Sequence, residues 1–261
     1  MVYNSRFGQT AIYFVLRKEV LTTQTIALID VIWRTTKSGT FLSVPANARQ
    51  TVCRQIMLGD LETMFITDAC DRYAARLGQV LSDYQWSGVE NMTRIIFEAW
   101  QADNHVFLCG NGGSAANAIH LANDFLYGVA GDLGRGISVE ALPANSSVLT
   151  CLANDISYDE VFVHQLQLLA SAEDVLLTVS SSGDSENVVR AAAWAKDTGM
   201  KVVALTGFDG GRTADLATIN LHVAGDNYGI IEDVHQSLMH LMGQYIRHAR
   251  MADDLIQSCR F

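Results

Sequence analysis

The chain has 261 residues, 49% of them hydrophobic and 18% charged, which suits one large α/β domain with an appendage or two small domains. A net charge of −10 without a basic stripe disfavours nucleic acid and membrane surfaces as partners, and no apolar run reaches the roughly 18 residues of a membrane span. The five scattered cysteines form no CxxC motif, so we expect reduced thiols and a cytoplasmic location.

Residues 1–56 differ in charge from the rest of the chain. They carry seven lysines and arginines against two acidic residues, a net charge of +5, whereas residues 57–261 carry −15. We therefore interpret residues 1–56 as a non-catalytic N-terminal extension of unknown role, with Met57 as an alternative start. Residues 57–261 then form the functional domain, including its N-terminal helices.

Helices and strands are expected to alternate from residue 58 onward. Apolar residues recur at three- and four-residue steps from Leu61 to Leu81, which predicts an amphipathic helix, and residues 89–103 predict a second one. Residues 105–110 are typical of a short buried strand, and a glycine-rich turn and a further helix follow it directly.

The same alternation continues toward the C-terminus. Further strands are expected at residues 136–143, 174–180, 201–207 and 219–225. Helices are expected after them, within residues 146–155, 181–199, 210–217 and 230–252. Strands that alternate with helices predict βαβ units and a mostly parallel sheet with helices on both faces.

Two strand-to-helix turns have unusual compositions. The glycine loop, residues 110–114, reads Gly-Asn-Gly-Gly-Ser, and the serine loop, residues 180–185, reads Ser-Ser-Ser-Gly-Asp-Ser. Glycines let backbone N–H groups approach an anion, and hydroxyls at a helix N-terminus can hold a phosphate monoester. Helix capping explains a single serine well, but two such loops in one sheet favour phosphate binding. Neither loop is a P-loop or a dinucleotide fingerprint, so a nucleotide cofactor is disfavoured.

Two predicted helices carry polar side chains spaced by four residues. His120 and Asp124 share one face of the helix after the glycine loop, and Glu232, Gln236 and His240 share a face of the last helix. Imidazole and carboxylate groups together suit zinc or a similar divalent ion, although a lone helical histidine is usually a hydrogen-bonded or surface residue. Phosphate loops at one end and acid–base groups further along indicate a phosphorylated sugar in extended form.

Five segments together resemble the sugar isomerase (SIS) domain family, and more narrowly its phosphoheptose isomerase branch. They are GNGGSAANAIHLANDF, LANDISYDEVF, SSSGDSENVVRAA, VVALTGFDGG and EDVHQSLMH, and the resemblance covers about residues 60–250. It implies a flavodoxin-like five-stranded parallel sheet with helices on both faces, preceded by N-terminal helices. It also implies a homotetramer with shared sites that interconverts sedoheptulose 7-phosphate and a manno-heptose 7-phosphate.

The resemblance also assigns roles to individual residues. It implies substrate or phosphate contacts by Asn111, Gly112, Gly113, Ser114, Asn154, Asp155, Ser180, Ser181, Ser182, Ser185 and Glu232. It implies a divalent metal, with zinc as the expected ion, at His120, Asp124, Glu232 and His240. Within that cluster, Asp124 matches the family's base and His240 its acid.

Two positions depart from the typical family pattern, which has glutamate in place of Asp124 and glutamine in place of Glu232. The ligand charge of the expected cluster is then −2 rather than −1, which favours a bound cation. An aspartate base sits about 1 Å short of a glutamate base, and misplacement on that scale can cost about a hundredfold in rate. The substrate is therefore expected to be a sugar phosphate of this class, with its identity left open.

The expected reaction is aldose–ketose isomerisation through an enediol. Asp124 is expected both as base and as metal ligand, and these two roles compete.

One alternative function is a non-catalytic SIS module that senses phosphosugars or binds a protein such as a replication initiator. Such a module needs the serine loop but not the set of His120, Asp124, Glu232 and His240. Another is a different SIS chemistry, such as pentose-phosphate isomerisation or sugar-acid processing. The four polar groups favour the isomerase.

Overall fold

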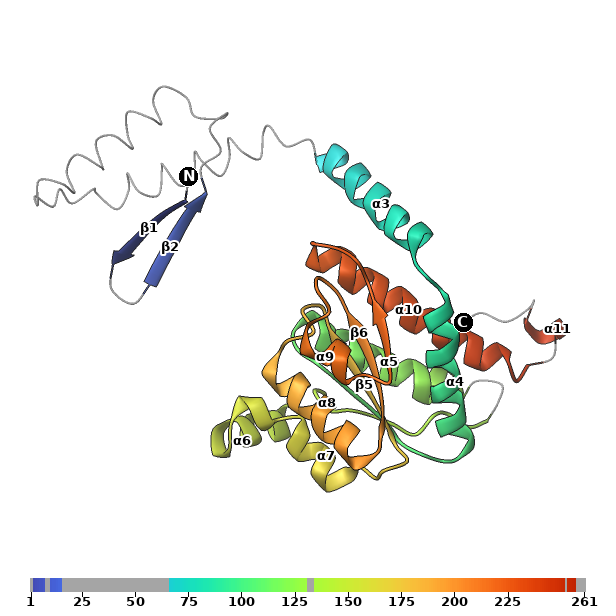
Figure 1. Ribbon diagram of the computed structural model, residues 1–261. Helices are drawn as coiled ribbons and strands as arrows, with labels where there is room; N and C mark the ends of the chain where they lie inside the picture. Colours follow the sequence, from blue (N-terminus) through green and yellow to red (C-terminus); the bar gives the residue numbers. More distant parts are fainter. Residues whose placement is uncertain (1, 8–9, 16–65, 131–133, 252, 257–261) are drawn as a thin grey trace, which may run out of the picture. The chain divides into compact units, whose positions relative to one another are not determined.

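The computed structural model describes residues 2–7, 10–15, 66–130, 134–251 and 253–256 (Figure 1). These residues fall into two units that are described separately. The first unit contains an antiparallel hairpin of β1 (Val2–Phe7) and β2 (Thr10–Val15).

Part of the sequence prediction lies outside the described residues. This applies to the expected boundary between residues 56 and 57, to the alternative start at Met57 and to the beginning of the helix expected from Leu61. The described part of that helix is α3 (Ile66–Asp83), and the second expected helix is α4 (Ser87–Gln101).

The second unit is built on five parallel strands in the order β4-β3-β5-β6-β7. They are β3 (Val106–Gly110), β4 (Val139–Ala141), β5 (Val175–Ser180), β6 (Lys201–Thr206) and β7 (Ile219–His222). This confirms the predicted five-stranded parallel sheet. Because β3 and β5 are neighbours, the glycine loop and the serine loop leave the sheet side by side at its carboxyl edge.

Helices pack on both faces of this sheet, as predicted. One face carries α4, α5 (Gly113–Asn123) and α10 (Tyr228–His248), and the other carries α6 (Ser146–Asp155), α7 (Val163–Leu169) and α8 (Glu186–Thr198). Shorter elements complete the unit: η1 (Asp124–Gly128), η3 (Tyr158–Glu160), α9 (Gly211–Leu216) and α11 (Asp253–Ile256).

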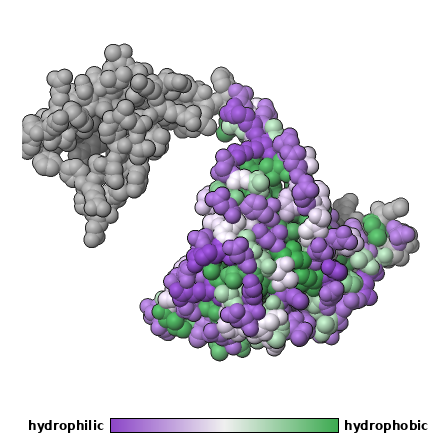
Figure 2. All heavy atoms as spheres, viewed as in Figure 1, coloured by the Kyte–Doolittle hydropathy of each residue, from purple (hydrophilic) through white to green (hydrophobic). Residues whose placement is uncertain are grey.

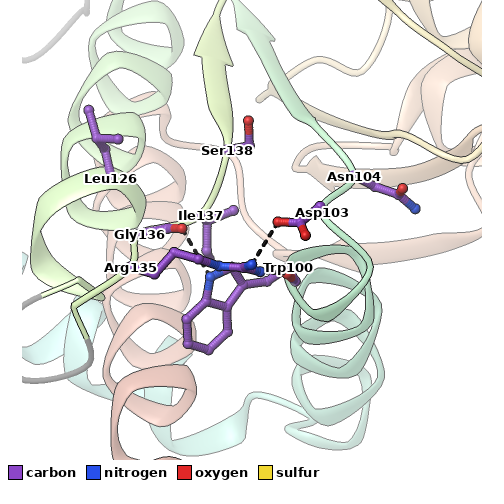
Figure 3. A pocket seen from close by; sticks show the side chains of 8 residues that line it. All are labelled: Trp100, Asp103, Asn104, Leu126, Arg135, Gly136, Ile137 and Ser138. Carbon is purple, nitrogen blue, oxygen red and sulfur yellow. Dashed lines mark hydrogen bonds and ion pairs between the residues drawn. The ribbon is translucent and has the colours of Figure 1, made fainter.

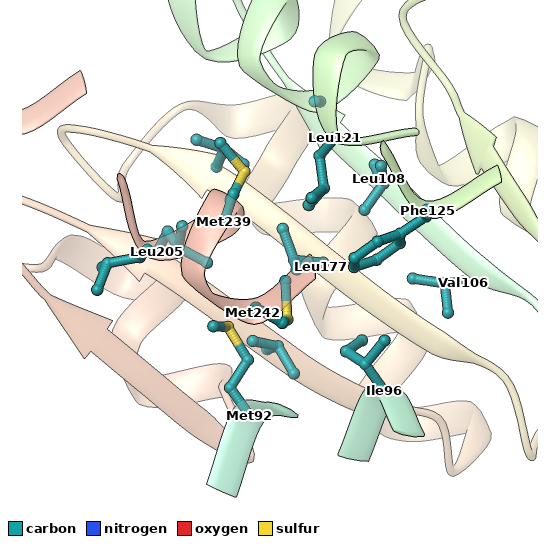
Figure 4. Packing of buried hydrophobic residues seen from close by; sticks show 14 of the residues in the cluster. Met92, Ile96, Val106, Leu108, Leu121, Phe125, Leu177, Leu205, Met239 and Met242 are labelled. Carbon is teal, nitrogen blue, oxygen red and sulfur yellow. The ribbon is translucent and has the colours of Figure 1, made fainter. Parts of the chain in front are cut away.

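Two hydrophobic cores follow from the strand pattern. Val106 and Leu108 point into the core beneath α4, α5 and α10, while Phe107 and Cys109 point into the core beneath α7 and α8. Figure 4 shows Leu121 and Met242 packed against strand residues in the first of these cores. A parallel strand buried on both faces reads as a continuous apolar run, which is the pattern that predicted β3.

The visible surface of the described unit is largely hydrophilic, with hydrophobic residues scattered between polar ones (Figure 2). Among the described helices, none is both long and apolar enough to cross a membrane.

Candidate functional site

Two asparagine side chains join the glycine loop to the helix after the serine loop. Nδ2 of Asn111 donates to Oδ1 of Asn187 at 2.8 Å, and Nδ2 of Asn187 donates to Oδ1 of Asn111 at 3.0 Å. Asn187 is only 2% exposed, so this reciprocal pair is held in a buried setting. The two loops therefore form one continuous polar edge of the sheet.

The glycine loop needs its glycines for close backbone approach. Gly112 has a φ of 55°, a left-handed conformation that favours glycine, and a Cβ at Gly110 would lie 2.7 Å from the carbonyl oxygen of Val179. Ser114 follows in the first turn of α5 and is buried. The loop thus brings backbone N–H groups and one hydroxyl to the N-terminus of α5.

The four serine hydroxyls of the serine loop have different surroundings. Oγ of Ser180 accepts a hydrogen bond from Gly183 N at 3.2 Å, and Oγ of Ser182 accepts one from Asp184 N at 3.3 Å. Ser181 is buried, and its Oγ has no hydrogen-bond partner among the described residues. Ser185 is the N-cap of α8, but its side chain makes no capping bond. Capping therefore does not account for the hydroxyls of Ser181 and Ser185.

The expected substrate contacts Asn154 and Asp155 lie at the exposed C-terminal end of α6. Nδ2 of Asn154 donates to Oδ1 of Asp155 at 2.8 Å, which holds the pKa of Asp155 below its ordinary value, and Sγ of Cys151 lies 3.4 Å from Oδ2. Tyr158, in η3, donates from its hydroxyl to Oδ1 of Asn111 at 2.9 Å. This bond ties the segment after α6 to the glycine loop.

Three of the expected metal or acid–base residues come together between α5 and α10. Nε2 of His120 lies 2.9 Å from Nε2 of His240, and Oδ2 of Asp124 lies 3.4 Å from the first and 3.8 Å from the second. The two rings are half exposed, whereas the Asp124 side chain is only 13% exposed. Oδ2 of Asp124 is buried and accepts no hydrogen bond within the described part of the chain.

Asp124 also marks a change of helix type that the sequence pattern did not predict. The α-helix α5 ends at Asn123, and η1, a π-helical turn, begins at Asp124. Its backbone oxygen accepts from Val129 N at 2.8 Å. Single π turns inside helices often occur at functional sites, because they shift the direction of a side chain relative to the regular helix.

Glu232 is not brought into this group. A Cβ at Gly113 would lie 2.5 Å from Oε2 of Glu232, so the carboxylate lies against the first turn of α5, beside the glycine loop. The group of mutually close donors in the described residues is His120, Asp124 and His240, with one negative charge rather than two. Gln236, one turn after Glu232, lies beside the histidines instead: its Nε2 is 2.9 Å from Nε2 of His240.

Another histidine of α10, His235, holds the helix to the sheet. His235 is fully buried, and its Nε2 lies 3.1 Å from the carbonyl oxygen of Thr206 at the end of β6. Burial lowers the pKa of His235 to about 4, so the ring is neutral near pH 7 with Nε2 as its donor. The bond fixes α10 to the carboxyl edge of the sheet.

Sequence reasoning gave no role to three residues that contact the site. Asn187, Tyr158 and Gln236 bond to Asn111 or His240. The spacing of four residues between Gln236 and His240 was the signal available for Gln236. Asn187 and Tyr158 depend on which loops become neighbours, and this is set by the strand order.

Comparison with known proteins agrees with the predicted fold and family. Residues 71–207 match the SIS domain family. The chain is 40% identical over 158 residues to a phosphoheptose isomerase of Aliarcobacter butzleri, covering 60% of this chain and 83% of that protein. It is 37% identical over 154 residues to a phosphoheptose isomerase of Helicobacter pylori, covering 59% and 80%.

Solved structures give the same result. A phosphoheptose isomerase from Neisseria gonorrhoeae has a TM-score of 0.65 at 30% identity, covering 70% of this chain and 99% of that one. One from Francisella tularensis has a TM-score of 0.67 at 26% identity, covering 71% and 100%. The chain belongs to the SIS domain family, and its relatives identify it as a phosphosugar isomerase. The non-catalytic alternative is not favoured.

Proposed function

We propose that the protein interconverts sedoheptulose 7-phosphate and a manno-heptose 7-phosphate. The main support is that one sheet edge carries both the joined loops and, further along α5, the His/Asp group. The six residue steps from Ser114 to His120 span about 9 Å of helix, which suits an extended sugar phosphate. The relatives named phosphoheptose isomerase indicate the seven-carbon sugar.

The loops supply the binding part of the proposal. Ser180, Ser181, Ser182 and Ser185, together with the N-terminus of α8, hold the phosphate through hydrogen bonds and the helix dipole. Asn111 through Ser114, the Asn154–Asp155 pair and Glu232 contact the sugar hydroxyls. The position of Glu232 against the glycine loop supports substrate contact rather than metal binding for this residue.

The chemical step is proton transfer through an enediol. A carboxylate oxygen of Asp124 removes a proton from the ketose carbon C1, while His240 donates a proton to the carbonyl oxygen at C2. The C1 hydroxyl proton then returns to His240, and Asp124 delivers its proton to C2, which gives the aldose. The buried Oδ2 of Asp124, which accepts no internal hydrogen bond in the described chain, supports its role as base.

The donor set of the site also fits a divalent metal. Two imidazoles and one carboxylate, with donor atoms all within 4.8 Å of one another, are ligands that zinc prefers in proteins. His120, Asp124 and His240 would hold the ion, which would polarise the carbonyl or anchor hydroxyls. Metal binding would compete with the roles of Asp124 as base and His240 as acid. We expect His120→Ala to lose bound zinc in elemental analysis of the purified protein, and retention of a full equivalent would contradict this metal site.

A homotetramer is part of the same proposal. The elements that carry the two histidines also expose apolar side chains: Ile119 and Tyr127 on α5 and η1, and Leu241 and Tyr245 on α10. Contact with another copy of the chain would cover them and exclude water from the His/Asp group. Light scattering should give four times the chain mass, and a monomer that is fully active would contradict the shared site.

The N-terminal extension enters the proposal as a part without catalytic function. A chain that begins at Met57 should keep kcat and KM for the sugar phosphate. A loss of activity in that shortened chain, with an unchanged thermal midpoint, would assign residues 1–56 a role in the reaction.

The reaction is tested by incubating the protein with sedoheptulose 7-phosphate, with and without zinc, and following aldose formation by NMR. Asp124→Asn and His240→Ala should remove turnover. Equal activity in both variants and the parent would contradict the acid–base assignment. If only five- or six-carbon sugar phosphates react, the isomerase stands and the proposed substrate is wrong.

A further inference from the structure

The serine loop contains a carboxylate that the proposed phosphate contacts do not use. Asp184 lies between Gly183 and Ser185, and Glu186 begins α8 immediately afterwards. Two negative charges beside hydroxyls that hold a phosphate dianion oppose its binding unless a nearby cation compensates them.

Arg212, in α9, contacts both of these carboxylates. Its Nε donates to Oδ1 of Asp184, its Nη2 donates to the backbone oxygen of Asp184 at 3.1 Å, and its Nη1 donates to Oε2 of Glu186 at 2.8 Å. Within the described part of the chain, Asp184 forms ion pairs with Arg212 alone, whereas Glu186 also pairs with Arg190. The planar guanidinium suits this fork of contacts better than an ammonium group does.

The backbone beside Arg212 is fixed independently of its charge. Backbone N and Oγ1 of Thr213 both donate to the carbonyl oxygen of Gly183, at 2.8 and 2.6 Å, and Thr213 is fully buried. A Cβ at Gly183 would lie 1.8 Å from the carbonyl oxygen of Gly210, so loop and α9 are in close backbone contact. Removing the guanidinium therefore leaves the path of the serine loop intact.

We propose that Arg212 sets the affinity of the serine loop for the substrate phosphate by neutralising Asp184 and holding its carboxylate against α9. The inference rests on the proposed phosphate role of the serine loop. Arg212 acts through Asp184 and touches no reacting atom, so it is a positioning residue and its loss affects binding rather than the proton transfers.

The test is a rescue experiment with steady-state kinetics on the sugar phosphate and with inorganic phosphate as competitor. Arg212→Gln should raise both KM and the inhibition constant of phosphate roughly tenfold, because an uncompensated carboxylate then faces the dianion, while kcat stays within about twofold. Adding Asp184→Asn to this variant should restore both constants to near the parent values. Arg212→Lys, which keeps the charge, should lie between the parent and Arg212→Gln.

Arg190→Gln is the matched control, because Arg190 pairs with Glu186 but not with Asp184. It should change KM less than Arg212→Gln does. An unchanged KM in Arg212→Gln, or a raised KM that Asp184→Asn does not restore, would overturn the inference. If phosphate does not compete with substrate in the parent, the phosphate site itself is misplaced, which is a separate failure of the proposed function.

Discussion

The two ends of the parallel sheet differ in how their polar groups are paired. At the amino end, a cavity of about 250 Å³ lies before β3 and β4 (Figure 3). Nε1 of Trp100 donates to the carbonyl oxygen of Gly136 at 3.0 Å, and Arg135 pairs with Asp103 at 2.7 Å and with the carbonyl oxygen of Trp100. The other polar side chains of the cavity are paired too: Asn104 donates to the carbonyl oxygen of Glu173, and Oγ of Ser138 lies 2.9 Å from Nδ1 of His105.

At the carboxyl end, two buried polar atoms form no hydrogen bond in the described chain, although Oδ2 of Asp124 lies 3.4 Å from Nε2 of His120. Oδ2 of Asp124 and Oγ of Ser181 are both buried without a hydrogen bond. Leaving a buried polar atom unpaired costs free energy, so such atoms indicate a ligand that completes them. We therefore place the proposed site at the carboxyl end, where Oδ2 of Asp124 and Oγ of Ser181 lie, rather than at the cavity of the amino end.

The largest expected effect comes from breaking the His/Asp group. His240→Ala should lower kcat by about 10²–10⁴-fold, because general acid catalysis contributes on that scale. Turnover of the sugar phosphate measured by NMR checks this, with Asp103→Asn at the amino end as a control that keeps full activity. Comparable losses of kcat in His240→Ala and Asp103→Asn would contradict the placement of the catalytic site at the carboxyl end.

One unpaired buried atom at the carboxyl end belongs to a structural residue, His235, and we expect it to affect the pH dependence of stability instead of ligand binding. Nδ1 of His235 is also buried without a partner, and the pKa of this ring falls from 6.5 to about 4 on burial. The unfolded histidine takes up a proton below pH 6.5 and the folded one does not, so stability is full above pH 6.5 and lost as pH falls toward 4. The loss amounts to roughly 3 kcal/mol.

Urea unfolding of the parent and of His235→Gln at pH 7.5 and pH 4.5 measures this loss. The parent should lose more stability than the variant between the two pH values. Equal losses would show that His235 does not carry the pH dependence.

A smaller effect is expected in the serine loop. Ser181→Ala should raise KM roughly tenfold to a hundredfold, since a hydrogen bond to a charged group is lost, and should leave stability nearly unchanged, since the hydroxyl has no internal partner. Thr178→Val is the matched control: its hydroxyl is also buried and unpaired, but it lies within β5. A KM increase in the control as large as in Ser181→Ala would contradict the phosphate role.

The smallest effect is expected at the amino end. Arg135→Gln should change kcat/KM by less than about twofold and the free energy of unfolding by less than about 1 kcal/mol, because its ion pair with Asp103 is largely exposed. Enzyme kinetics and urea unfolding measure both quantities. A strong loss of activity with intact stability would place a functional site at this end as well.

The strands and the two loops could be predicted because their signals are local. Buried parallel strands such as β3 are continuous apolar runs, and glycine and serine cluster where backbone or hydroxyl groups must approach a ligand. His120, Asp124 and His240 could be grouped by helical spacing together with the family resemblance.

The other features of the site depend on how side chains and loops are arranged in the folded protein. Helical spacing places Glu232 and Gln236 on one face of α10, yet only the second lies beside His240 while the first meets Gly113. The π turn at Asp124 breaks the regular spacing that the sequence suggests. The Asn111–Asn187 pair exists because β3 and β5 are neighbours in the sheet. The local sequence around Asn111 or Asn187 does not predict this strand order.

In the proposed reaction, Asp124 moves a carbon-bound proton of a sugar phosphate held by the serine loop. The most direct test is isomerisation of sedoheptulose 7-phosphate in deuterated water, followed by proton NMR of the aldose at C2. We expect deuterium at C2 with the parent, and neither product nor exchange with Asp124→Asn. Exchange at the parent rate in Asp124→Asn would contradict it.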